Sequence, residues 1–267
     1  QPQEVLARVE THLVLRNLQK NLQQEVAERD AFAAAVSHDL KNPLALVVGF
    51  AETLLEKYAT LSEAELESHL QTIARNGRRM QAITDALLLL SRVHKTKVET
   101  ALLDMARIVA KALEQLSFMI EQRQAEIVLP SEKDWPVVSG YGPWVEQVWV
   151  NYISNALKYG GEPPRVTLGA TVPLEASLNP PMVRFWVRDN GKGLTPEEQA
   201  QLFTPFTRLH HFQAQGHGLG LSIVQRIVSK LGGEVGVKSP PPSPQNSEDK
   251  ADLTHQGSLF WFTLPLV

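Results

Sequence analysis

The chain has 267 residues, of which 43% are hydrophobic and 21% charged, and it contains no cysteine. This length predicts two domains, and the apolar content is enough for a real core, which argues against wholesale disorder. A formal net charge of −3 disfavours a nucleic-acid binder with a broad basic surface. The lack of cysteine excludes disulfide scaffolds, thiol nucleophiles and cysteine-ligated metal centres, and it fits a reducing compartment.

No apolar run approaches the length of a membrane span. Runs such as Ala86–Leu90 are far shorter than the ~20 residues that a span needs, so we expect no membrane contact by this chain. The chain opens at Gln1 without a basic-then-apolar leader, and we expect it to be a fragment or a processed product.

The first third of the chain has the pattern of two long helices. From residue 3 to about residue 58, apolar residues recur at spacings of three and four, and Pro43 is the single proline. Ser62 and Glu65 form a capping-box pattern, which predicts a second helix that runs to about Arg92. A lone antiparallel hairpin cannot bury so much apolar surface. We therefore expect a homodimer in which two hairpins form a four-helix bundle.

Residues 1–30 are more charged than the rest of this region, and Glu25 and Arg29 interrupt their apolar stripe. We interpret them as a coiled-coil connector from a missing N-terminal domain. An independent surface helix is the alternative.

After about Lys95 the chain mixes prolines, tryptophans and β-branched runs, which indicates an α+β domain. The predicted strands are 98–102, 125–129, 136–138, 165–171, 183–188, 234–237 and 258–264. The predicted helices are 104–122, 143–159, 196–202 and 219–231. Two polar, proline-containing insertions, 173–181 and 239–256, are expected to be flexible loops.

A polar stripe marks the helix predicted at 143–159. Asn151 and Asn155 are four residues apart and share one helical face, and Lys158 places a positive charge on the same side. Two stacked amide oxygens can orient a hard cation or its waters. A merely solvated polar face is the alternative.

Two glycine-containing motifs follow. The first, Asp189–Leu194, places a carboxylate directly after a predicted strand, and its glycines let a flat ligand approach the backbone closely. The second, Gly216–Ser222, opens a predicted helix whose free N–H groups and dipole favour phosphate. It is neither a dinucleotide-binding fingerprint nor a P-loop. Each motif alone is also compatible with an ordinary turn. Between them, 202–215 has the composition of a hinged segment that closes over a ligand.

The first helix contains one outstanding site, Ser37–Leu44. Pro43 lacks the N–H that would bond the carbonyl of Asp39, which predicts a bend just after His38. Asn42 lies one turn beyond His38 on the same face. A histidine beside a carboxylate can act as a proton carrier or a nucleophile.

Taken together, these motifs resemble those of the sensor histidine kinases of two-component systems over residues 32–267. Ser37–Leu44 is similar to the phosphoacceptor box, Asn151–Tyr159 to the N box, Asp189–Gly193 to the G1 box, Phe203–Phe206 to the F box and Gly216–Leu221 to the G2 box. The resemblance implies a fold of class α plus α+β. A helical hairpin that forms a dimeric four-helix bundle (31–95) would precede a Bergerat-type α/β sandwich that binds ATP (96–267).

The resemblance also implies an activity and a role for each site residue. His38 would attack the γ-phosphate of ATP, and Asp39 would bond the imidazole and accept its proton. The phosphoryl group would then pass to an aspartate in the receiver domain of a response regulator, in the cytoplasm. Asn155 would coordinate Mg²⁺ with support from Asn151. In such proteins an Asn at the position of Asn42 accompanies phosphatase activity toward the regulator.

The remaining implied contacts are with the nucleotide. Asp189 would accept the adenine amino protons. The other nucleotide-binding residues would be Lys158, Tyr159, Gly191, Gly193, Phe203, Phe206, Gly216, Gly218, Leu219 and Gly220.

Two other functions stay open. One is a phosphatase-dominant or non-catalytic signalling scaffold, against which the intact His38, Asn155 and Asp189 count. The other is an ATPase of the gyrase or Hsp90 kind, which the histidine-bearing dimerisation hairpin disfavours.

Overall fold

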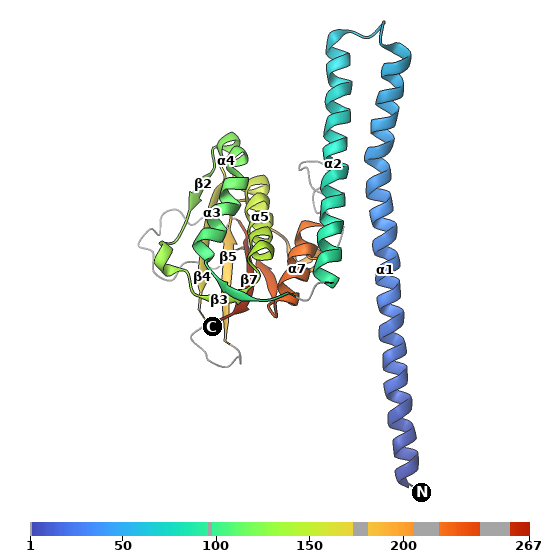
Figure 1. Cartoon of the computed structure of the whole chain (residues 1–267), viewed down its shortest axis with the longest axis vertical. Helices are drawn as coiled ribbons and strands as arrows, with labels where there is room; N and C mark the ends of the chain where they lie inside the picture. Colours follow the sequence, from blue (N-terminus) through green and yellow to red (C-terminus); the bar gives the residue numbers. More distant parts are fainter. Residues whose placement is uncertain (1, 96–97, 173–180, 205–218, 241–256) are drawn as a thin grey trace. The chain divides into compact units, whose positions relative to one another are not determined.

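The computed structural model describes residues 2–95, 98–172, 181–204, 219–240 and 257–267. The chain divides into two compact units, residues 1–83 and residues 84–267 (Figure 1). No helix in the described ranges is long and apolar enough to cross a bilayer.

The first unit is built from two long helices, α1 (Pro2–Lys57) and α2 (Glu63–Lys95), and α2 runs on into the second unit. The predicted capping box at the start of α2 is confirmed. The backbone N–H of Ser62 donates to the Glu65 carboxylate at 2.9 Å, and the N–H of Glu65 donates to Ser62 Oγ at 3.4 Å. The Ser62 hydroxyl also donates to the Glu65 carboxylate at 2.7 Å, and this bond together with that from the Ser62 N–H lowers the pKa of Glu65. The two backbone N–H groups have no partner within the helix, so the capping box satisfies them. Pro43 lies inside α1, which neither ends nor breaks there.

The second unit is organised around a five-stranded sheet in the order β2-β4-β5-β7-β6. Its strands are β2 (Glu126–Val128), β4 (Arg165–Thr171), β5 (Met182–Arg188), β7 (Leu259–Pro265) and β6 (Val235–Lys238). β2 pairs with β4 in parallel, and the other neighbours are antiparallel. A separate two-stranded sheet joins β1 (Ala101–Leu103) to β3 (Val138–Gly140).

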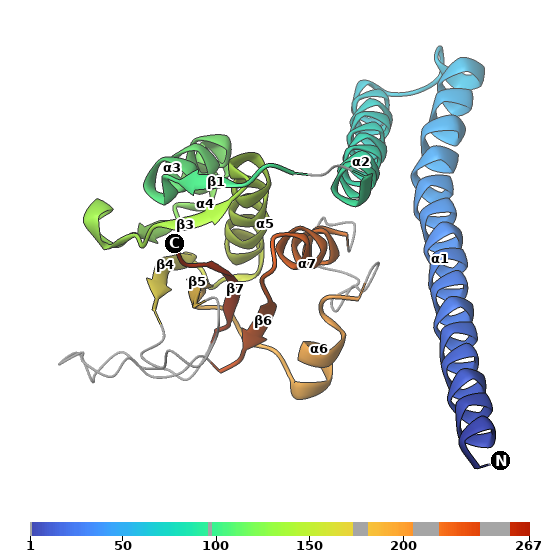
Figure 2. The same cartoon turned by 60° about the horizontal axis from the view of Figure 1, so that its bottom comes forward.

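Helices cover one face of the five-stranded sheet (Figure 2). α5 (Gly142–Tyr159) packs on β4 and β5, and α7 (Gly220–Lys230) packs on β6 and β7. The other helices are α3 (Met105–Gln115), α4 (Ser117–Arg123), the short 3-10 helix η1 (Glu132–Asp134) and α6 (Pro196–Gln201). The result is a two-layer α/β sandwich, as expected.

The core between the two layers is rich in aromatic rings. Alternate residues of β5 and β7 point inward, which buries Phe185 and Phe262 beneath α5. The Phe262 ring lies 5.3 Å from those of both Trp149 and Phe185, and Tyr152 of α5 donates its hydroxyl hydrogen to the Trp261 carbonyl at 3.0 Å. This packing ties α5 to the two central strands.

Two details of the second unit differ from the sequence-based expectation. The single helix predicted at 104–122 is divided at Leu116, whose N–H bonds the carbonyl of Leu113 and whose side chain is buried. β1 begins three residues later than predicted and β3 two residues later, because the pairing of Leu103 with Val138 sets the register of these short strands. The insertions predicted at 173–181 and 239–256 fall almost wholly outside the described residues.

Replacing Phe262 with alanine should destabilise the second unit by about 3–5 kcal/mol, because the cavity would open among fully buried rings. Urea denaturation followed by tryptophan fluorescence measures this change. Phe118→Ala on α4 is the matched control, since that ring is 76% exposed and should cost less than about 0.5 kcal/mol. Equal losses in the two variants would contradict this packing.

Candidate functional site

His38 projects from α1 with both ring nitrogens engaged. The side chain is 72% exposed. Its Nδ1 lies 3.2 Å from Asp39 Oδ1, and its Nε2 lies 3.3 Å from Asn42 Nδ2. An ionised carboxylate only accepts, and the amide nitrogen only donates. Both contacts are therefore satisfied by the neutral tautomer with hydrogen on Nδ1 and a lone pair on Nε2.

The neighbouring Ser37 takes no part in this arrangement, because its hydroxyl donates to the carbonyl of Ala33 at 2.9 Å. Ser37, His38 and Asp39 therefore do not form a hydrolytic triad. The site on α1 is an exposed imidazole backed by a carboxylate, which suits a nucleophilic nitrogen rather than an activated hydroxyl.

In the second unit, Asp189 follows β5 directly and is only 7% exposed. Its Oδ1 accepts two backbone hydrogen bonds, from Gly191 N–H at 2.8 Å and from Ser258 N–H at 3.1 Å. Burial raises the pKa of Asp189 to about 6, although these bonds and the nearby Arg188 act in the opposite direction. No described residue donates to Oδ2, so this oxygen can accept a hydrogen bond from a ligand.

The amides of α5 have different surroundings. Asn151 donates to the Gln147 carbonyl at 2.8 Å, and its Oδ1 lies against Gly220, where a Cβ would be 2.4 Å away. Asn155 is half-buried, and no described residue hydrogen bonds with its side chain. Burial lowers the pKa of Lys158, one turn further on. Asn155 is thus available to a ligand, whereas Asn151 packs closely against the start of α7.

The structure brings the described parts of the three motifs together through α5. Asn151 touches the G2 segment at Gly220. At the other end of the helix, the carbonyl of Tyr159 lies 2.2 Å from where a Cβ of Gly191 would be. The side chain of Leu219 is buried at the beginning of α7. Phe203 is half-buried just after α6. Phe206, Gly216 and Gly218 lie outside the described residues.

Sequence reasoning missed several residues that shape this site. The Asn190 amide accepts from the N–H groups of Gly161 and Arg165 at 2.9 and 2.8 Å and donates to the Pro163 carbonyl at 3.1 Å. These three hydrogen bonds therefore hold the loop between α5 and β4 in place. An asparagine within Asp-Asn-Gly is a recognisable turn signal. Ser239 and Ser258 carry no comparable signal, because their partners lie far away in the sequence.

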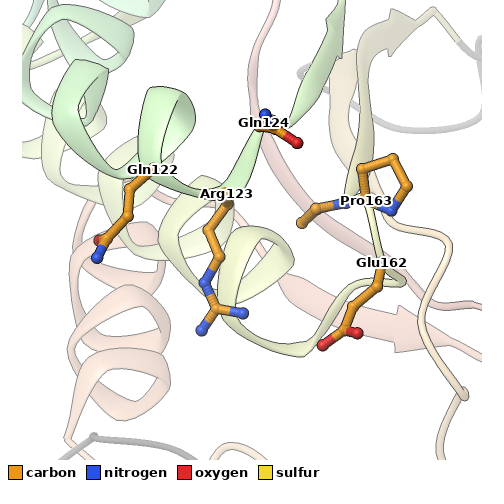
Figure 3. Close-up of a pocket in the computed structure, with 6 residues that line it drawn as sticks. Gln122, Arg123, Gln124, Glu162 and Pro163 are labelled. Carbon is orange, nitrogen blue, oxygen red and sulfur yellow. The ribbon is translucent and has the colours of Figure 1, made fainter.

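Two surface hollows among the described residues can be compared with the positions of the motifs. The larger, of about 380 Å³, is lined by Gln122, Arg123, Gln124, Glu162, Pro163 and Pro164, with Arg123 and Glu162 on opposite sides (Figure 3). It contains none of the motif residues. The smaller, of about 230 Å³, is lined by Lys192, Gly193, Leu194, Thr195, Ser239 and Pro240. Only the smaller hollow adjoins the Asp189 loop.

Two family models match the chain. Residues 28–96 match the His Kinase A (phospho-acceptor) domain. Residues 140–267 match the histidine kinase-, DNA gyrase B- and HSP90-like ATPase. The two matches together cover about three quarters of the chain, and they contain His38 and Asp189 respectively.

Whole proteins and solved structures agree with these matches. Cyanobacterial phytochrome B of Nostoc sp. is 32% identical over 94% of this chain and 31% of its own length. The sensor histidine kinase TrcS of Mycobacterium tuberculosis is 33% identical over 78% of this chain and 41% of its own length. The structure of the histidine kinase ThkA in complex with the response regulator protein TrrA matches with a TM-score of 0.68 at 18% identity, over 92% of this chain and 64% of that one.

The chain spans about a third of the length of the first curated relatives that it matches. What it shares with them is the helical phosphoacceptor region followed by the α/β ATPase region. The chain therefore belongs to the sensor histidine kinases, of which it carries the catalytic core.

Proposed function

We propose that this chain binds ATP, phosphorylates itself on His38 and passes the phosphoryl group to an aspartate of a response-regulator receiver domain. The observation that carries the proposal is the exposed imidazole of His38, held between Asp39 and Asn42, in a chain that also has an ATPase-type domain. We retain the division into a connector (1–30), a dimerisation and phosphotransfer domain (31–95) and a catalytic domain (96–267).

The phosphorylation step follows from the tautomer of His38. The Nε2 lone pair, released from Asn42, attacks the γ-phosphorus. The bond between that phosphorus and the β–γ bridging oxygen breaks, and ADP leaves. As the imidazole gains positive charge, its Nδ1 proton passes to the Asp39 carboxylate, which is 3.2 Å away. The Asp39 side chain is only 16% exposed, which strengthens this electrostatic contact.

ATP recognition is assigned to the second unit. Asp189 Oδ2 would accept from the adenine amino group, and Lys158 and Tyr159 would contact the nucleotide. The start of α7, with Leu219 and Gly220, would face the phosphates through its N–H groups.

The donor set of α5 fits a Mg²⁺ ion that arrives with ATP. Among the described residues, no cluster of three or more His, Asp or Glu could hold a metal. Mg²⁺ at such sites keeps waters and phosphate oxygens and needs only one or two protein ligands. The unengaged amide oxygen of Asn155 would supply one, and Asn151 would support the same face. When bound, the ion would neutralise charge on the phosphates.

The partners proposed are a second copy of the chain and a receiver domain. Leu15, Leu18 and Leu22 form an exposed apolar stripe at coiled-coil spacing on α1, as expected if a second copy covers it. The ThkA structure contains a response regulator, and we propose a partner of the same class. The cytoplasmic location that the resemblance implies belongs to the same proposal.

A second activity, dephosphorylation of the regulator, is favoured by the position of Asn42. Its amide nitrogen lies one turn from the imidazole and 3.3 Å from Nε2. From there it could hydrogen-bond a water and direct it at a phosphoaspartate on a docked regulator. An amide cannot act as a base at neutral pH, so its contribution would be positioning.

His38→Gln should abolish labelling by γ-labelled ATP, because an amide has no nucleophilic ring nitrogen. Nucleotide affinity, measured by calorimetry, should stay within about twofold, since the nucleotide is assigned to the other unit. The wild-type label should be acid-labile and alkali-stable. His12→Gln, an exposed histidine on the same helix, is the control and should keep the label. Label that persists in the His38 variant would refute the assigned acceptor, and an unlabelled wild type would favour the scaffold.

Asp189→Asn should weaken ADP binding by about 1–3 kcal/mol, because the amide presents a donor where an acceptor is needed. The same change should stabilise the nucleotide-free protein at about pH 8. The folded-state pKa of Asp189 is raised from 3.8 to about 6, so its ionisation above pH 6 opposes folding. Asparagine removes this cost, which is on the order of 1–3 kcal/mol. Calorimetry and thermal melts measure the two effects.

The pH dependence of the stability difference between Asp189→Asn and wild type is a separate test. The advantage of the Asp189 variant should shrink as the pH falls through about 6, where the wild-type carboxyl takes up its proton and regains stability. A variant that is less stable than wild type at about pH 8, or that binds ADP equally well, would contradict the assignment.

Asn42→Ala should retain autophosphorylation and phosphotransfer but lose most of the dephosphorylation of the regulator, about tenfold or more in rate. The measurement is the decay of purified phospho-regulator with ADP and either wild type or variant. Autophosphorylation of the same variant is the internal control. Equal decay rates would leave the chain a kinase only and would assign Asn42 to the backbone before Pro43 instead.

A further inference from the structure

We propose that Ser239 is a positioning residue for nucleotide recognition, which acts by fixing the peptide that holds the Asp189 carboxylate. This inference rests on the proposed assignment of Asp189 to the adenine amino group. Ser239 follows β6 directly and does not belong to any of the motifs that the sequence indicated. It is half-buried, and both its side chain and its carbonyl are engaged.

The hydroxyl of Ser239 joins two distant segments. It donates to the Gly257 carbonyl at 2.7 Å and accepts from the Leu194 N–H at 2.9 Å. The Ser258 hydroxyl lies 3.3 Å from it. One side chain thus connects the loop after Asp189 to the residues that lead into β7.

The Gly257–Ser258 peptide transmits this contact to Asp189. Its carbonyl accepts from Ser239 Oγ, and its N–H donates to Asp189 Oδ1 at 3.1 Å. The two bonds leave one rigid peptide plane in opposite directions, so a rotation that breaks one also weakens the other. Each bond also polarises the peptide in the sense that strengthens its partner. The sequence Ser239–peptide–Asp189 is therefore a single hydrogen-bonded chain.

The local backbone is shaped so that this chain can form. Gly193 and Gly257 have φ values of +80° and +113°, which side-chain-bearing residues rarely adopt. A Cβ on Gly193 would lie 2.7 Å from Ser239 Oγ, and one on Gly257 would lie 2.2 Å from the Asp189 carbonyl oxygen. These glycines let three segments meet around the serine hydroxyl.

A glutamine supports the same junction from α6. Gln199 Nε2 donates to the Ser239 carbonyl at 2.9 Å and to the Leu194 carbonyl at 3.0 Å. Ser239 is thus held from the backbone side as well, and its hydroxyl is presented to Gly257 in one orientation.

The consequence for recognition is geometric. The N–H groups of Gly191 and Ser258 bind Oδ1 and so restrain rotation of the Asp189 carboxylate, which favours one position for Oδ2 as an acceptor. Loss of the Ser239 hydroxyl loosens the Ser258 side of this clamp. The carboxylate then selects less sharply between a purine that carries an amino group at position 6 and one that carries a carbonyl.

The test is calorimetric titration of wild type, Ser239→Ala and Ser229→Ala with ADP and with IDP, which has a carbonyl at position 6. Wild type should prefer ADP. Ser239→Ala should lose about five- to tenfold in ADP affinity while IDP affinity changes by less than about twofold, so that the preference for ADP falls. Ser229→Ala, an exposed serine on α7, should behave like wild type.

The outcomes distinguish a failure of the adenine assignment of Asp189 from a failure of the positioning role of Ser239. If wild type does not prefer ADP to IDP, the adenine assignment of Asp189 fails, and with it this inference. If wild type discriminates and Ser239→Ala keeps the same ratio, or loses affinity for both nucleotides equally, the positioning role of Ser239 is overturned alone. Should Ser239→Ala not fold, Gln199→Ala is expected to lower the ratio in the same direction, and an unchanged ratio there overturns the proposal.

Discussion

The ATPase-type unit depends on keeping one carboxylate both buried and able to ionise. Burial alone would hold Asp189 protonated near neutral pH, and a neutral carboxyl is a poor acceptor. The two N–H groups that bind Oδ1 offset part of this cost, and they come from opposite sides of the group: Gly191 follows it in the sequence, and Ser258 precedes β7. The pairing of β5 with β7 brings them together, so the sheet register and the electrostatics of the site form one constraint.

The second constraint is that one helix serves three motifs. Its inner face packs on β4 and β5, with Trp149 and Tyr152 fully buried, so α5 has little freedom to shift. From this fixed position Asn151 meets the start of α7, and the carbonyl of Tyr159 meets the turn at Gly191. Asn155 lies between these contacts and is left for a ligand. Hydrophobic packing on one side of α5 thereby sets the positions of polar groups on the other.

The features that sequence predicted well are those decided by neighbouring residues. The start of α2 follows from Ser62 and Glu65, and β4 has the predicted bounds because alternation over seven residues is a clear strand signal. The position of Asp189 at the end of a strand was also predictable, since the strand and the turn are both local patterns.

Features decided by distant partners were not predictable in this way. The Ser258–Asp189 and Ser239–Leu194 hydrogen bonds span 69 and 45 residues. The sequence around each serine does not predict such a distant partner. The division of α3 from α4 depends on burial of Leu116, which periodicity alone does not reveal. The bend expected just after His38 stays a prediction, since α1 continues as one helix through Pro43.

The most direct test of this account is the pKa of Asp189 itself, followed by the carboxyl carbon resonance in NMR titrations with and without ADP. In the free protein the pKa should be about 6, raised by burial. Bound ADP should lower it, because an amino donor at Oδ2 stabilises the ionised form. A pKa close to the ordinary value of 3.8 in the free protein, with no change on ADP binding, would contradict the central claim that a buried carboxylate reads the nucleotide.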